Sequence, residues 1–330
     1  MEHRTPDTGD QPPRFVQLHR VDDGALAGEA AAGLMQPRAQ VPPKFFYDAL
    51  GSRLFDAITE LPEYYPTRTE AAVCSEHAAA ITSAALRCTG AAPVLVDLGA
   101  GNCAKAARLF GLLRPRRYVA VDISADYLRQ ALEALQREHP QMELVGVGMD
   151  FAQRLQLGAD VVGRGPTLVF YPGSSIGNFA PDDARRLLRE ARALCNGGAL
   201  LIGVDLVKPR DVLEAAYDDE LGVTAAFNLN LLKHLNRLLG ADFDVRQWQH
   251  VAFFDDVASR VEMHLQARRD LVVAWPGQRR AFACGERIHT ENSYKWTTGG
   301  FAALLREAGF GELQQWSDDR HWFAVFVASG

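Results

Sequence analysis

The sequence predicts an α/β protein with a Rossmann-like parallel sheet and a second, smaller α+β domain. Short apolar runs that are typical of buried strands alternate with helical patterns between residues 94 and 206. A glycine-containing loop follows the first of these runs. After residue 206 the alternation gives way to a leucine-rich helix and to period-two segments, which are typical of antiparallel strands. These three observations favour two units of different architecture.

The composition narrows the class of protein. The 330 residues are 48% hydrophobic, which is enough for one large domain or two unequal ones. The net charge is −6 and basic residues are interspersed with acidic ones, so we expect no nucleic-acid partner. The longest apolar runs are too short to cross a bilayer, and the polar N-terminus lacks a signal core. Five cysteines without a CxxC pair indicate reduced thiols and no zinc site. We expect a cytoplasmic monomer with no membrane partner.

The first third of the chain is expected to be helical after a flexible tail. Residues 1–20 are polar and contain prolines, so we expect a flexible N-terminal tail there. The pattern is helical and alanine-rich from residue 22 to about residue 61. Pro62 and Pro66 enclose two tyrosines and predict a fixed turn, because each proline ring sets its own φ. A long helix is expected over residues 69–88.

Strands and helices then alternate in the order of a parallel sheet that is covered on both faces. Strands are expected near residues 94–98, 118–122, 143–149, 167–172 and 199–205, with helices near 104–114, 124–138 and 181–195. A helix ending at Gly240 and period-two segments at 258–268, 269–275 and 280–284 follow, and then a helix at 298–308 and strands near 312–316 and 321–328. We predict one domain from residues 69–206 and 296–330. Residues 21–68 and 207–295 form the other, substrate-binding domain.

The loop after residue 98 predicts an adenosine-containing ligand. Gly99 and Gly101 permit a sharp turn and a close approach of the backbone, and Asp122 ends the next strand, where its carboxylate can accept bonds from ribose hydroxyls. This loop alone leaves NAD open. Asp150 and Phe151 after the third strand would place a carboxylate and a ring beside an adenine. Together with a helix–strand–strand ending, which indicates a reversed last strand, they favour S-adenosylmethionine.

Six separate sequence blocks resemble one known family. They are PKFFYD (43–48), LPEYYPTR (61–68), GSSIGN (173–178), YDD (217–219), GVTAAFN (222–228) and TENSYK (290–295). In order and spacing these blocks resemble the L-histidine Nα-methyltransferases that make hercynine on the route to ergothioneine. The resemblance extends from about residue 43 to the C-terminus. It implies a class I methyltransferase sheet, S-adenosylmethionine as methyl donor and L-histidine as substrate.

The resemblance also implies roles for individual residues. Those matching the cofactor positions are Gly99, Lys105, Asp122, Asp150 and Phe151. Those matching the amino-acid pocket are Tyr64, Gly173, Asn178, Tyr217, Met263, Glu291 and Ser293, with Tyr47 close by. Tyr47 and Tyr64 are the expected catalytic residues, whose hydroxyls pass a proton to water, and no single residue is expected to be a general base. The loop 102–104 and residues Asn292 and Tyr294 depart from the commonest family pattern.

The residues Glu291 and Ser293 fit the recognition of an imidazole ring. Two positions apart on a strand, they share a face, where a carboxylate and a hydroxyl can satisfy both ring nitrogens. We expect the carboxylate to favour the protonated ring. His250, Glu262 and His264 are interpreted as part of a solvated strand face, and no metal is expected. The alternatives are methylation of another amino acid, an NAD-dependent oxidoreductase, or a non-catalytic binding module.

Overall fold

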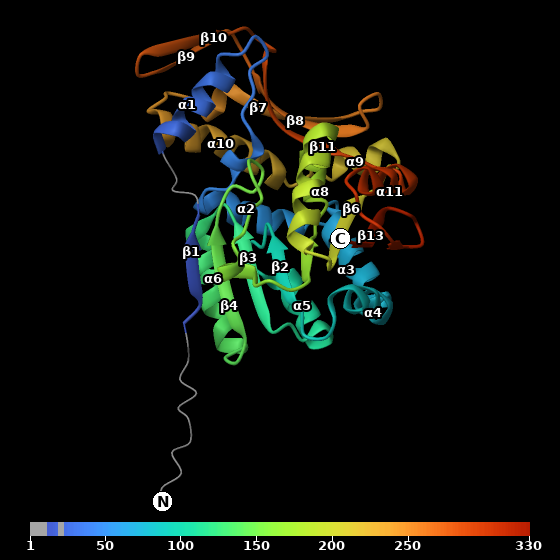
Figure 1. The fold of residues 1–330 in the computed structure, drawn as a ribbon. Coiled ribbons are helices and arrows are strands. Elements are labelled where there is room, and N and C mark those ends of the chain that lie inside the picture. Colours follow the sequence, from blue (N-terminus) through green and yellow to red (C-terminus); the bar gives the residue numbers. More distant parts are fainter. Residues whose placement is uncertain (1–11, 19–22) are drawn as a thin grey trace, which may run out of the picture.

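The computed structural model describes residues 12–18 and 23–330, and its centre is an eight-stranded sheet (Figure 1). The strands have the order β1-β4-β3-β2-β5-β6-β13-β12. All neighbours are parallel except β13, which runs antiparallel to both β6 and β12. The reversed strand expected near the C-terminus is therefore confirmed. The strands are β1 (Arg14–Gln17), β2 (Val94–Leu98), β3 (Arg117–Asp122), β4 (Glu143–Gly148), β5 (Thr167–Tyr171), β6 (Ala199–Asp205), β12 (Leu313–Ser317) and β13 (Phe323–Ser329).

Helices cover both faces of this sheet because its strands are apolar on both sides. Val94 and Val96 point to one face, where they share a core with α8 and α11. Leu95 points to the other face, which packs against α4, α5 and α6. The helices of this part are α3 (Tyr65–Glu76), α4 (Ala78–Thr89), α5 (Ala104–Leu113), α6 (Ala125–Glu138), α7 (Ala159–Val162), η2 (Ser175–Asn178), α8 (Pro181–Cys195) and α11 (Thr298–Glu307).

A second core lies above the carboxyl ends of the parallel strands, at the top of Figure 1. It is built on a three-stranded antiparallel sheet of order β11-β8-β7 and on α10, against which the N-terminal helices pack. Its elements are α1 (Asp23–Leu34), η1 (Pro43–Phe46), α2 (Ala49–Thr59), α9 (Arg210–Ala215), α10 (Val223–Leu239), η3 (Val245–Gln247), β7 (Trp248–Asp255), β8 (Arg260–Ala267), β9 (Leu271–Trp275), β10 (Gln278–Phe282) and β11 (Arg287–Tyr294). The exact domain boundaries given above stay a prediction.

The flexible tail expected over residues 1–20 is wrong for residues 14–17, which form β1 on the edge of the sheet beside β4. The cause is that β4 has glycines, which carry no side chain, at the positions beside β1. A Cβ on Gly146 would lie 2.6 Å from the ring of Phe15, and one on Gly148 would lie 2.6 Å from the amide of Gln17. The two glycines therefore leave the space that these side chains fill. Residues 1–11 and 19–20 of the expected tail lie outside the described residues.

Two expected helices are divided. The helical pattern of residues 22–61 forms α1, η1 and α2, because Pro37, Pro42 and Pro43 interrupt it. The expected helix over residues 69–88 is two helices, α3 and α4, which meet at His77, whose backbone leaves the helical region at φ −103° and ψ 18°. No helix in the described part of the chain is long and apolar enough to span a membrane.

Candidate active site

The glycine loop after β2 meets the acid at the end of β3. Gly99 and Gly101 have φ values of 72° and 53°, a backbone conformation that residues with a side chain adopt only with strain. The Asp122 carboxylate accepts hydrogen bonds from the backbone N–H of Gly101 at 2.9 Å and of Ser124 at 2.8 Å. Burial raises the pKa of Asp122, although these backbone bonds oppose the shift. Each carboxylate oxygen has a second lone pair, so the acid retains the capacity to accept ribose hydroxyls.

Asp150 and Phe151 follow β4 at the same edge of the sheet. The Asp150 carboxylate is buried and accepts hydrogen bonds from the Lys44 ammonium and the Gln153 amide, both at 3.1 Å. The Phe151 ring lies edge-on to Tyr171 with ring centres 5.8 Å apart. Sequence reasoning gave no role to Lys44, which reaches this carboxylate from η1. The ion pair joins the two parts of the molecule at the predicted cofactor site.

Lys105 connects the glycine loop with the turn after β5. Its ammonium lies 2.7 Å from one oxygen of Glu70, and the other oxygen of Glu70 accepts the backbone N–H of Gly173 at 2.7 Å. A Cβ on Gly173, whose φ is 78°, would lie 2.9 Å from the Lys105 nitrogen. Glu70 is buried on α3 and was not predicted. No local signal in the sequence distinguishes it from an exposed helical glutamate.

A cavity lies between the carboxyl ends of β5 and β6, the N-terminal segment and β11. It is lined by Tyr47, Phe55, Tyr64, Pro66, Gly173, Ser174, Ser175, Asn178, Asp205, Tyr217, Glu291 and Ser293. The structure thus brings together Tyr47 and all the predicted pocket residues except Met263. Met263 is buried on β8 directly opposite Glu291 and packs in the second core. The cavity volume is about 40 Å³, well below the roughly 300–1,000 Å³ of ligand pockets, so side chains must move apart for an amino acid to enter.

The aromatic hydroxyls of this cavity are neutral donors. Burial raises the pKa values of Tyr47, Tyr64 and Tyr217 well above the ordinary value, and the charge of nearby Glu291 adds to the effect. Phenols that stay protonated at neutral pH can hold a substrate through hydrogen bonds. They are poor general bases.

Glu291 is an acceptor without a partner. Burial raises its pKa to about 7, and the charge of Lys295 opposes that shift. Within the described residues, no hydrogen bond to its carboxylate is found. A buried carboxylate that faces a cavity and lacks a donor is complementary to a ligand N–H.

Sequence reasoning missed five lining residues, which are Phe55, Pro66, Ser174, Ser175 and Asp205. Asp205 had a usable signal, because it ends a parallel strand in the same way as Asp122. Ser174 has a φ of 57° and accepts the backbone N–H of Asp205 at 2.8 Å. Phe55 reaches the cavity only through the packing of α2 on α10, which no short-range pattern encodes.

The expected solvated face of β8 is wrong. Glu262 and His264 are buried, and His289 pairs opposite His264, so atoms of all three that could ligate a metal lie within 4.8 Å. Burial lowers the pKa of His264 to about 4, which leaves a neutral ring. Both Glu262 oxygens are already engaged, one by the Arg260 guanidinium and one by His264 at 2.8 Å. A metal would have to displace Arg260, and we assign none. His250 instead contacts the backbone oxygen of Tyr217 at 2.8 Å.

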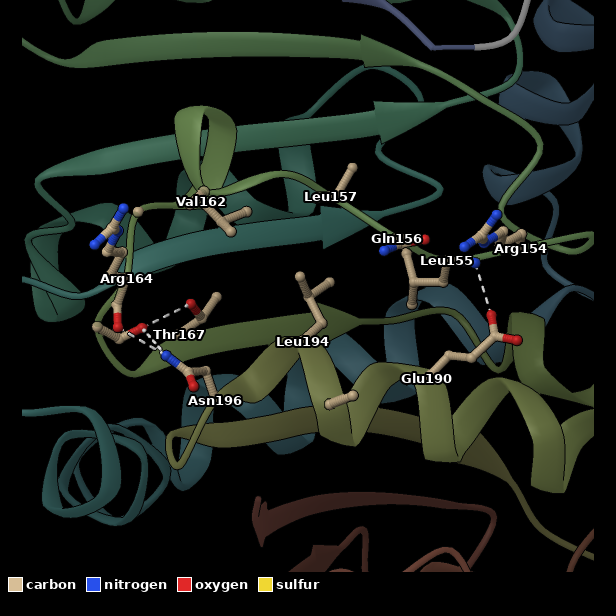
Figure 2. Close-up of a pocket in the computed structure, with 14 residues that line it drawn as sticks. Arg154, Leu155, Gln156, Leu157, Val162, Arg164, Thr167, Glu190, Leu194 and Asn196 are labelled. Atoms are coloured by element: carbon tan, nitrogen blue, oxygen red, sulfur yellow. Dashed lines mark hydrogen bonds between the residues drawn. The ribbon is translucent and has the colours of Figure 1, made fainter.

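A larger hollow of about 590 Å³ lies between residues 154–165 and α8 (Figure 2). Two hydrogen bonds hold its walls. The backbone N–H of Leu155 donates to the Glu190 carboxylate at 2.6 Å, and the Asn196 amide donates to the carbonyl of Arg164 at 2.9 Å. None of the predicted site residues lines it. Ligands of open parallel sheets bind outside the carboxyl ends of the strands, which favours the smaller cavity.

The glycine loop, the acid after the second strand of the unit and the inserted antiparallel strand are the features of a class I methyltransferase. Residues 26–330 match the histidine-specific, S-adenosylmethionine-dependent methyltransferases, and the chain belongs to this family. This membership does not favour the oxidoreductase alternative that the glycine loop left open.

Two curated relatives cover nearly the whole chain. Histidine N-alpha-methyltransferase of Mycolicibacterium smegmatis is 41% identical over 92% of this chain and 94% of its own length. The protein of the same name from Mycobacterium tuberculosis is 38% identical over 92% of this chain and 95% of its own length. Ergothioneine biosynthesis protein 1 of Schizosaccharomyces pombe is 28% identical over 88% of this chain, which spans 39% of that longer protein.

Proposed function

We propose that the protein transfers three methyl groups from S-adenosylmethionine to the α-amino group of L-histidine. The product is hercynine, an intermediate of ergothioneine biosynthesis. The observation that carries the proposal is the unpartnered, buried Glu291 carboxylate beside the Ser293 hydroxyl, in a cavity at the cofactor edge of the sheet. An imidazole ring supplies the N–H and the second nitrogen that this pair can satisfy. The names of the relatives support the same substrate.

Positioning accounts for most of the proposed catalysis. S-adenosylmethionine, when bound, supplies an electrophilic methyl group on a sulfonium. Deprotonating a peptide-terminal amine of pKa ~8 at pH 7 costs on the order of 1.4 kcal/mol, and the more basic amine of a free amino acid costs more, whereas orienting two bound reactants contributes ~7–11 kcal/mol. The neutral hydroxyls of Tyr47 and Tyr64 and the Asn178 amide hold the amine, and water carries its proton away.

The cofactor site fits this reaction. Asp122 would hold the ribose hydroxyls, while Asp150 and Phe151 would flank the adenine. Lys105 and Gly173 lie between that edge and the amino-acid cavity through their shared contact with Glu70. The amine and the methyl group would therefore meet near Gly173, at the boundary between the two parts of the molecule.

Mass spectrometry tests the proposed function. Purified protein with L-histidine and S-adenosylmethionine should yield mono-, di- and trimethylated histidine, and fragmentation should place every added methyl on the α-nitrogen. L-Phenylalanine and L-tryptophan are the matched substrates, because they share the backbone groups and lack the imidazole. Methylation of either of these in preference to histidine would refute the histidine assignment and leave a methyltransferase of another amino acid.

A further inference from the structure

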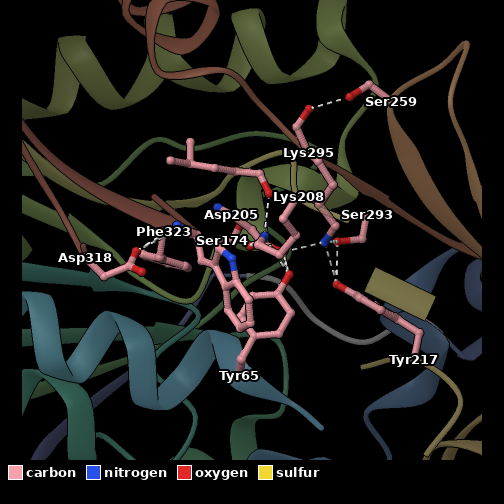
Figure 3. A network of polar contacts seen from close by, with 12 residues as sticks. Tyr65, Ser174, Asp205, Lys208, Tyr217, Ser259, Ser293, Lys295, Asp318 and Phe323 are labelled. Atoms are coloured by element: carbon pink, nitrogen blue, oxygen red, sulfur yellow. Dashed lines mark hydrogen bonds and ion pairs between the residues drawn. The ribbon is translucent and has the colours of Figure 1, made fainter. Parts of the chain in front are cut away.

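Lys295 is buried directly behind the pair of hydroxyls in the proposed histidine pocket (Figure 3). Its ammonium lies 2.8 Å from Ser293 Oγ, 2.9 Å from Tyr217 Oη and 2.8 Å from Asp205 Oδ2. An ammonium has three N–H donors and no acceptor, so these three contacts use it completely. Lys295 therefore has no donor left for a ligand and acts on the pocket only through its neighbours.

Asp205 holds Lys295 in a fixed place. Its carboxylate also contacts the ammonium of Lys208 and accepts the Tyr65 hydroxyl at 2.7 Å. Burial raises the pKa of Asp205 and the charges of Lys295 and Lys208 lower it, with a net lowering, so the acid stays ionised. The side chains of Asp205, Lys208 and Lys295 are at most 1% exposed, so two buried ammoniums share one carboxylate, and removal of Asp205 would leave both without it.

The hydrogen bonds of this network determine which proton faces the cavity. Ser293 Oγ and Tyr217 Oη both accept a hydrogen bond from Lys295. They lie 2.6 Å from each other, so one of the two hydroxyls donates its proton to the other. The phenol is the more acidic hydroxyl and hence the better donor. With Tyr217 donating to Ser293, both lone pairs of Ser293 are occupied and its own proton is free to point into the cavity.

We infer that Lys295 is a positioning residue that makes Ser293 a hydrogen-bond donor, so that the pocket accepts histidine with a neutral imidazole in one tautomer. The inference rests on the proposed function and deepens it. The ring N–H donates to Glu291 and the bare ring nitrogen accepts from Ser293. This reverses the first expectation, in which the carboxylate favours the protonated ring.

A protonated ring does not fit the donors present. An imidazolium needs two acceptors, and Ser293 has no free lone pair while Lys295 holds it. In the described part of the chain, the charged and titratable side chains that line the cavity are Glu291, Asp205 and the hydroxyls of Tyr47, Tyr64 and Tyr217, and the ammoniums of Lys295 and Lys208 lie behind them on Asp205. Glu291 when ionised, and Asp205, attract a cationic ring, Lys295 repels it and the tyrosines are neutral. The hydrogen-bond pattern then decides in favour of the neutral ring.

Nitrogen-15 NMR of ring-labelled L-histidine tests the inference. The labelled amino acid is bound to the full-length protein with S-adenosylhomocysteine present, so that no methyl transfer occurs. At about pH 6, below the ordinary imidazole pKa of ~6.5, free histidine is mostly protonated. The bound ring should show one protonated and one unprotonated nitrogen, with well-separated nitrogen-15 chemical shifts. Two protonated nitrogens in the wild type would overturn the inference while leaving the proposed function intact.

Lys295→Met and Lys208→Met form a matched pair, because each removes a buried ammonium from Asp205 and only Lys295 contacts Ser293 and Tyr217. Lys295→Met should weaken histidine binding by roughly 3- to 10-fold at pH 8. At pH 6 the variant protein should bind histidine with a protonated ring. Lys208→Met should keep the neutral-ring spectrum. If Lys295→Met does not fold, Ser293→Ala tests the Ser293 donor through affinity, and histidine binding at pH 8 should weaken by roughly 3- to 10-fold.

A Lys295→Met protein that keeps the wild-type spectrum and affinity would show that Lys295 does not orient Ser293. Unchanged histidine affinity in a folded Ser293→Ala protein would count equally against the inference. Absence of saturable histidine binding to the wild type would instead refute the proposed function, and the inference with it.

Discussion

At the scale of single residues, the site is marked by polar groups that are buried at a cost. Glu291 is buried without a hydrogen-bond donor, and burial raises its pKa to about 7. The tyrosines around it remain neutral because ionisation inside the cavity is unfavourable. Such groups weaken the ligand-free protein and are stabilised by a substrate that satisfies them.

Glu291→Gln should therefore stabilise the ligand-free protein at high pH and weaken its action on histidine. The folded pKa lies above the ordinary value of 4.5, so the wild type loses stability as pH rises from about 4.5 to about 7. At pH 8 the variant should gain up to roughly 3 kcal/mol in free energy of unfolding, and near pH 4 it should match the wild type. Its kcat/KM for histidine should fall roughly 10- to 150-fold.

Urea unfolding at the two pH values measures the first effect, and initial rates measure the second. Glu133→Gln, on the exposed face of α6, is the control and should change neither quantity. Equal stability of Glu291→Gln and wild type at pH 8 would mean that the carboxylate is solvated in solution.

At the scale of elements, the turn after β5 delivers the pocket residues. Gly173 and Ser174 both have positive φ, so the chain reverses sharply before η2. After this reversal the Gly173 N–H donates a hydrogen bond to Glu70, and the Ser174 hydroxyl accepts one from the backbone N–H of Asp205. Asn178, at the end of η2, is thereby held at the cavity.

Gly173→Ala should damage activity more than its backbone strain explains. The new Cβ would meet the Lys105 nitrogen at 2.9 Å and disturb the contact with Glu70. Gly197→Ala is the matched control, because Gly197 has nearly the same φ, 79° against 78°, and its Cβ would meet nothing within 4 Å. Both variants should lose about 1–2 kcal/mol in free energy of unfolding, because a Cβ makes the left-handed backbone conformation unfavourable. Only Gly173→Ala should show a large fall in kcat/KM, and equal kinetics of the two variants would contradict the role of this turn.

At the scale of the whole molecule, segments distant in sequence meet at the site. The N-terminal segment supplies Tyr47 and Tyr64, the turn after β5 supplies Gly173, the end of β6 supplies Asp205, and β11 supplies Glu291. Lys44 contacts Asp150 across the boundary between the two cores, and Tyr65 contacts Asp205 140 residues away. The cavity therefore exists only when both cores are folded.

The edge strand β1 should contribute measurably to that fold. A protein lacking residues 1–17 should lose about 1–3 kcal/mol in free energy of unfolding, because β4 loses a hydrogen-bonded neighbour and Phe15 leaves the core. A protein lacking only residues 1–11 is the control and should unfold like the full chain. Urea titration followed by circular dichroism makes the comparison, and identical midpoints for the two truncations would show that β1 is dispensable.

The sequence by itself determined the parallel strands, the glycine loop with Asp122 and the reversed last strand, because each depends on local periodicity or on a turn of a few residues. Its blocks also indicated most residues that line the cavity. Only the tertiary structure decided that β1 joins the sheet, that Glu262 and His264 are buried, and that Lys295 lies behind Ser293 with Asp205 and Lys208. The physical reason is that burial and pairing of these charges depend on contacts between distant segments, such as Tyr65 and Asp205 140 residues apart, and no local pattern records which segments will pack together.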